Sequence, residues 1–224
     1  MSSVMAVLAW VPRLLVLHLA WVVIVLAGAV VGGLAPATVV LVAELREGAD
    51  DGPAARARRV LVRLRAEAVA ANLAAGPFVL IALAAGTNLV LGVAGALPAP
   101  FVPVGLPLAA LLGVLATLGA AHAVALRVLR PEAPAPLIWR GALAGPVLLP
   151  VATTSWTITL LATAAASAVI QPLGLLLGGG ILVAVTTHVL TRAWQLRLER
   201  ALAPSRVPAP AEAPVPARAA QAGR

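Results

Sequence analysis

The chain has 224 residues, of which 62% are hydrophobic and 11% charged, with a net charge of +8 and a mean hydropathy of +1.03. A soluble domain carries about 25% charged residues, so this composition excludes an ordinary water-soluble domain and indicates a membrane protein. The absence of cysteine excludes disulfides and cysteinyl metal sites, and the lack of aromatic residues interleaved with the arginines argues against a nucleic-acid partner.

Five stretches are apolar over a length that can cross a membrane, which takes about 20 helical residues for a hydrocarbon layer of ~30 Å. They cover residues 14–34, 69–92, 104–126, 141–166 and 172–190. The sequence therefore predicts an all-α fold, a polytopic transmembrane helix bundle with five spans, within a membrane domain of residues 14–203.

The arginines indicate the topology. All of them except Arg13 lie in residues 35–68, 127–140 and 191–224. Because short cytoplasmic loops collect arginine, we expect residues 1–13 outside and the C-terminus in the cytoplasm, as in a multi-pass protein of the cytoplasmic membrane. A cleaved signal peptide beginning at Arg13 is the alternative, but its apolar core would normally be only 7–15 residues long.

The first predicted span ends in the sequence GGLAPAT, residues 32–38. Glycine and proline disfavour a continuous helix, and a straight helix from Leu14 to Leu45 would measure about 48 Å. We therefore expect a corner between Gly33 and Pro36, followed by a short helix, residues 37–47, at the inner membrane surface.

A second cytoplasmic helix is predicted over residues 54–68, after the helix-start sequence Asp-Asp-Gly-Pro. It is basic and amphipathic, and its candidate contact residues are Arg56, Arg58, Arg59, Arg63 and Arg65. Such a helix can bind anionic lipid headgroups or a protein partner. It can equally be the positive anchor of the span that follows, and the two roles are compatible.

Polar residues inside predicted spans suggest a site. No acid lies in any span, which removes the usual proton or sodium carrier. A candidate inner polar pocket comprises Asn72, His122, Pro146, Pro150, Thr187 and His188. The alternative is that each polar side chain bonds a neighbouring helix, and the hydroxyls of residues 153–159 bond the preceding turn. His18 is expected near the outer boundary of the membrane.

The C-terminal residues and the missing motifs give three further expectations. Residues 204–224 are rich in proline and alanine, which predicts a disordered cytoplasmic tail. Sequence motifs of proteases, hydrolases and nucleotide-binding loops are missing, so we expect neither an enzyme nor a cofactor. A homo-oligomer is left open.

The stretch from residue 33 to 72 resembles the YesL family of bacterial membrane proteins. The residues that carry the resemblance are Gly33, Pro36, Ala37, Thr38, Arg46, Gly48 and Asn72. The family often accompanies sugar-uptake ABC transporters, so the resemblance implies an accessory or partner-binding role in carbohydrate uptake, with a sugar ABC transporter as partner. The alternative is a small-solute transporter or channel that uses the inner polar pocket.

Overall fold

The computed structural model describes residues 3–48 and 52–202, and it contains helices and no strand in this part of the chain. The elements are α1 (Ser3–Ala27), α2 (Val31–Glu47), α3 (Pro53–Val93), α4 (Val102–Leu129), α5 (Ala135–Leu148), α6 (Pro150–Val169), α7 (Gln171–Val185), the π-helix η1 (Thr186–Thr191) and α8 (Arg192–Leu202). The predicted disordered tail, residues 204–224, lies outside the described residues.

Four of these helices are long and apolar enough to cross a membrane, and α5 with α6 forms a fifth candidate span broken by a bend of 89°. The prediction of an all-helical fold is thus confirmed for the described residues, and four or five candidate membrane spans are present. The bend falls at Leu149, between Pro146 and Pro150. Proline cannot donate the backbone bond that a straight helix needs, so a sharp break at this pair is expected.

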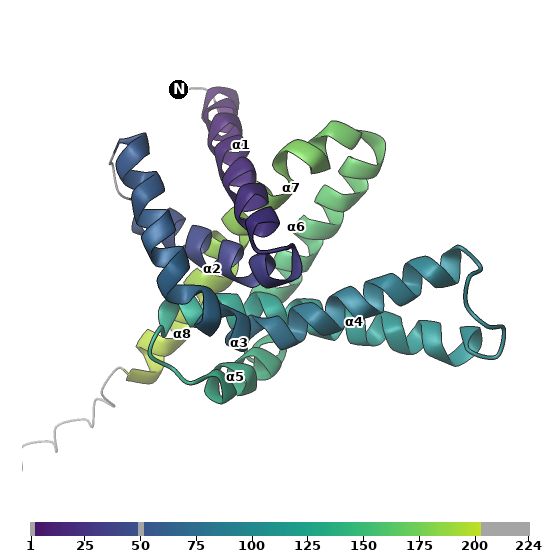
Figure 1. Ribbon diagram of the computed structural model, residues 1–224. Helices are drawn as coiled ribbons and strands as arrows, with labels where there is room; N and C mark the ends of the chain where they lie inside the picture. The colour runs from purple at the N-terminus through teal and green to yellow at the C-terminus, as the bar shows by residue number, and fades with distance from the viewer. Residues whose placement is uncertain (1–2, 49–51, 203–224) are drawn as a thin grey trace, which may run out of the picture.

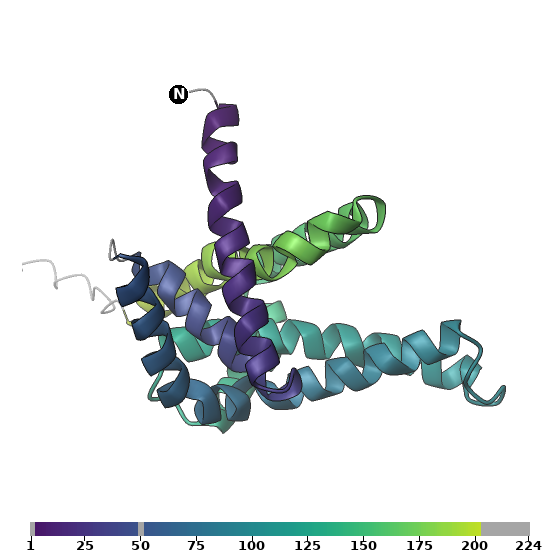
Figure 2. The ribbon, with the colours of Figure 1, turned by 45° about the horizontal axis from the view of Figure 1, so that its top comes forward.

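Two helical hairpins diverge from a common hub. Figure 1 shows α3 with α4 forming one hairpin and α6 with α7 forming the other, and Figure 2 shows the same separation after rotation. Helix α1 crosses α7, and α2 lies where the two hairpins meet (Figure 1). The hub therefore holds the core of the molecule, while the hairpin tips lie far from it.

Helix α2 contains the predicted helix of residues 37–47, and other helices of the chain enclose it. Ala37, Val40 and Val42 are fully buried, because α2 is covered by α1, α3, α4, α7 and η1. A helix that is apolar on all sides is a buried helix, and the four consecutive buried aliphatic residues Val39, Val40, Leu41 and Val42 are of this kind.

The corner between α1 and α2 lies at residues 28–30, several residues before its predicted place. Ala29 and Val30 take positive φ angles of 53° and 65°, and Pro36 lies inside α2. Gly33 does not end a helix. It lets the start of α2 touch α1, because a Cβ there would lie 2.6 Å from the Val25 carbonyl oxygen.

The arginine-bearing segments meet at one side of the hub. Glu44 of α2 bonds Arg59 of α3, Glu67 of α3 bonds Arg127 of α4, and Arg46 of α2 donates to Gln195 of α8 at 3.3 Å. Helix α3 has 41 residues, or about 61 Å, which is twice the thickness of the hydrocarbon layer. Its basic first part therefore extends beyond any membrane that its second part crosses.

Candidate functional site

A fully buried histidine connects three helices at the hub. His122 of α4 has no exposed surface, and its Nε2 lies 2.9 Å from the Thr153 hydroxyl of α6. Its Nδ1 accepts a hydrogen bond of 2.9 Å from the indole N–H of Trp194 of α8. Gly145 makes room for the ring, since a Cβ at that position would lie 2.5 Å from it. We call His122, Thr153 and Trp194 the polar hub.

The direction of these bonds fixes the state of the ring. An indole N–H can only donate, so His122 Nδ1 carries no proton, and the ring proton lies on Nε2 and is donated to Thr153. The Thr153 hydroxyl donates in turn to the Leu149 carbonyl at 2.9 Å. The chain of bonds thus ends at the α5–α6 bend, and it holds α4, α6 and α8 together around a neutral histidine.

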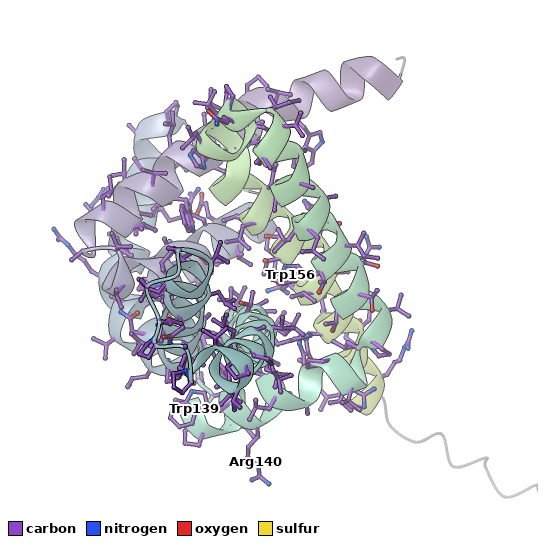
Figure 3. The ribbon with its side chains drawn as sticks, turned by 90° about the vertical axis from the view of Figure 1, so that its right-hand side faces the viewer. Trp139, Arg140 and Trp156 are labelled. Atoms are coloured by element: carbon purple, nitrogen blue, oxygen red, sulfur yellow. The ribbon has the colours of Figure 1, made fainter. Side chains whose placement is uncertain are left out.

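A second buried indole, that of Trp156, joins α6 to η1. Trp156 of α6 is buried and donates to the Thr186 hydroxyl of η1 at 3.1 Å. The Thr191 hydroxyl bonds the Thr186 carbonyl five residues earlier, in keeping with the wider π-helical turn. Figure 3 shows Trp156 pointing toward the space between the two hairpins.

The structure does not gather the six predicted pocket residues into one cavity. His122 is enclosed in the hub between Trp194 and the α5–α6 bend that Pro146 and Pro150 flank. Thr187 bonds the Val183 carbonyl of its own helix. His188 is exposed on the outer side of η1, where its ring packs edge-on against Trp10 at 5.6 Å, and Asn72 lies against α2. Residues that lie at a similar depth in the predicted spans can face different sides of their helices, so a similar depth does not bring their side chains together.

The alternative role, in which polar side chains bond neighbouring helices or the preceding turn, is what the structure contains. The hydroxyls of Thr157 and Thr159 bond carbonyls four residues earlier, at 2.9 and 2.8 Å. His18, predicted at the membrane boundary, is instead 7% exposed and accepts the backbone N–H of Gly179 at 3.0 Å. The contact of His18 with α7 depends on Gly179, which lies far away in the sequence, so the residues around His18 could not indicate this contact.

Side chains from other helices compensate for two prolines. Pro36 leaves the Gly32 carbonyl without its usual N–H partner, and the Asn72 amide of α3 donates to that oxygen at 2.9 Å. Pro77 leaves the Leu73 carbonyl free, and the indole of Trp139 donates to it at 3.0 Å. Since an unsatisfied carbonyl is costly in a bilayer, these two bonds attach α2 to α3 and α3 to α5.

We expect Asn72→Leu to lower the free energy of unfolding by about 1 kcal/mol, because it leaves the Gly32 carbonyl unpaired. In a Pro36→Ala background residue 36 regains an N–H for that carbonyl, so the same Asn72→Leu change should then cost markedly less. Unfolding of the four proteins of this cycle in detergent measures the coupling. Equal costs of Asn72→Leu in both backgrounds would contradict the assignment.

A small cavity lies where the two hairpins meet. It measures about 250 Å³ and is bounded by α1, α2, α3, α4, α6, α7 and η1. Its aromatic walls are Trp21 and Trp156, and its hydroxyls come from Thr38, Thr117 and Thr186. Trp21 already donates to Thr38 at 3.1 Å, and Thr117 bonds its own helix. The cavity holds no charged group or amide side chain, so it suits a small apolar molecule better than a sugar.

The basic residues of α3 divide into two sets. Arg59 forms a two-bond ion pair with Glu44, at 2.5 and 3.1 Å, and Arg63 bonds Glu47 at 2.6 Å. Arg56 lies 3.8 Å from Glu44. The Arg59 hydrogen bond lowers the pKa of the Glu44 carboxyl below its ordinary value, with burial acting in the opposite direction. This set therefore fastens α3 to α2 at neutral pH.

The second set is exposed on one stripe of α3. Arg58 and Arg65 are exposed and form no ion pair with any described residue, and Leu61 and Val62 between them are 48% and 61% exposed. The four residues follow the spacing i, i+3, i+4 and i+7, which places them on one face of a helix. We call them the α3 stripe. Of the five arginines expected to contact lipid or a partner, Arg56, Arg59 and Arg63 thus face the acids of α2.

Within residues 3–48 and 52–202 no group of three or more histidine, aspartate or glutamate side chains could hold a metal ion. Comparison of the chain with protein-family models, curated proteins and solved structures finds no match in any of the three.

Proposed function

We propose that the chain is a non-enzymatic accessory protein of a bacterial cytoplasmic membrane, with its N-terminus outside and its C-terminus in the cytoplasm. In this proposal it binds a protein partner through the α3 stripe. The distribution of arginine supports the orientation, since the segments that carry it meet at one side of the hub.

The exposed α3 stripe is the observation that carries the proposal. Arg58 and Arg65 flank Leu61 and Val62 on a part of α3 that extends past the membrane. Arginine beside exposed aliphatic side chains is typical of a binding surface for an acidic, partly apolar helix or loop. The YesL resemblance suggests that this partner is the permease of a sugar importer.

The test is recovery of the importer permease with the tagged chain from membranes of its native cells. We expect the double change Arg58→Ala and Arg65→Ala to reduce that recovery by about tenfold or more, because both arginines would contact the partner. The chain itself should still insert and accumulate, since neither side chain bonds a described residue.

The matched control is Arg140→Ala. Arg140 is an exposed arginine on α5 that points away from the molecule in Figure 3, so its removal should leave the recovery unchanged. Equal recovery with the stripe variant, or recovery of no transporter subunit by the unaltered chain, would contradict the proposal.

A solute transporter or channel is the second candidate, and the 250 Å³ cavity supports it. Because Trp156 forms a wall of this cavity, Trp156→Ala should change the flux of an apolar solute into liposomes. The replacement of the exposed His188 by alanine should leave it unchanged. An absence of flux over a broad panel of solutes would remove this candidate.

A further inference from the structure

A groove lies beside the α5–α6 bend. It measures about 980 Å³ and lies between the end of α5, the start of α6, η1 and α8. The 89° bend opens the groove on one side, and α8 forms the facing wall. Figure 3 shows α8 running beside the α5–α6 corner.

The two walls of the groove differ in chemistry. One is apolar and includes Leu149 and Val151. The other carries Arg192, Arg197 and Arg200 of α8. The apolar wall continues onto an exposed apolar surface, where the side chains of Val147 and Val151 are 81% and 79% exposed.

The three arginines of the groove are exposed and form no ion pair with any described residue. No carboxylate of residues 3–48 or 52–202 lines the groove, and the one acid of α8, Glu199, accepts a hydrogen bond of 2.9 Å from Gln195 instead. His188 and Ser155 add polar atoms to the lining. The groove is thus positively charged and open.

We propose that this groove binds one anionic phospholipid. The headgroup phosphate lies among Arg192, Arg197 and Arg200, and the acyl chains follow the apolar wall toward Val151. Guanidinium groups pair with phosphate through two parallel hydrogen bonds, and basic pockets between membrane helices at the cytoplasmic side hold anionic headgroups. A soluble phosphate compound would use the arginines and leave the apolar wall exposed. The inference is independent of the partner proposed above, and it requires only that α8 lies at a membrane surface.

The experiment is a titration of the full chain in detergent with phosphatidylglycerol or phosphatidylcholine, with bound lipids counted by native mass spectrometry. We expect one tightly held phosphatidylglycerol and at least about tenfold weaker retention of phosphatidylcholine. The triple change Arg192→Gln, Arg197→Gln and Arg200→Gln should abolish this difference between the two lipids.

The charge-matched control is Arg13→Gln, Arg130→Gln and Arg140→Gln, which removes three exposed arginines that do not line the groove and should leave the tight lipid in place. Ser155→Trp fills the groove without changing charge and should also displace the lipid, which keeps the test decisive if the groove triple variant is unstable. Equal retention of both lipids by the unaltered chain, or an equal loss in the control, would overturn the proposal. Complete displacement of phosphatidylglycerol by glycerol phosphate would also overturn the proposal. The same holds if the full chain takes up no lipid because residues 203–224 occupy the groove.

Discussion

Replacement of Gly180 by alanine is expected to separate α1 from α7. A Cβ at this position would overlap the backbone carbonyl oxygen of Leu14, and it would lie 3.3 Å from the backbone nitrogen of His18. Backbone atoms cannot rotate away as a side chain can, so α1 must shift as a whole. That shift would also stretch the bond between His18 and the Gly179 N–H. We expect a loss of about 2 to 3 kcal/mol in the free energy of unfolding, the range for overpacking in a tightly packed core.

Gly178→Ala is the matched control for this change. It lies two residues earlier in the same helix, and a Cβ there meets no atom within 4 Å. Alanine is a better helix former than glycine, so this variant should be unchanged or more stable by up to about 1 kcal/mol. Unfolding of both variants in detergent measures the two effects. Equal stability of the two variants would show that α1 does not cross α7 at Gly180.

The helical class and most of the membrane segments could be predicted from the sequence because they depend on local apolar length. Four of the five predicted spans overlap helices that can cross a membrane, and the fifth overlaps the bent pair α5 and α6. The bend of this pair also has a local cause, because Pro146 and Pro150 lie on either side of it and proline disrupts the helix that contains it. The hydroxyls of Thr157 and Thr159 were equally predictable, because their partners lie one turn away.

The corner and the pocket could not be predicted, because each depends on which helix faces which. Gly33 looked like a helix end, yet it is a contact point with Val25 of α1. Pro36 looked like a helix start, yet it is tolerated inside α2 because Asn72 of a distant helix donates to the freed carbonyl. His122 and His188 occupy similar depths, but one is enclosed and the other exposed, and depth alone does not distinguish the sides of a helix.

His122→Leu provides the second large effect, and it separates a structural role of this residue from a transport role. The change leaves the Trp194 indole N–H buried without an acceptor and removes the bond to Thr153. We expect the free energy of unfolding to fall by about 2 kcal/mol, above the ~0.6 kcal/mol average for one polar contact between membrane helices, because two bonds are lost at a site with no exposed surface.

A double-mutant cycle with Trp194→Phe tests this account of the polar hub. Phenylalanine has no N–H to leave unpaired, so His122→Leu should cost less in the Trp194→Phe background, by about 1 kcal/mol. His188→Ala serves as the control and should leave stability unchanged, since that ring is exposed. If His122 were instead the binding residue of a transporter, His122→Leu would abolish flux and leave stability intact. A stable, inactive His122→Leu protein would therefore contradict the structural role, whereas an unstable one whose defect Trp194→Phe partly corrects would establish that His122 holds α4, α6 and α8 together.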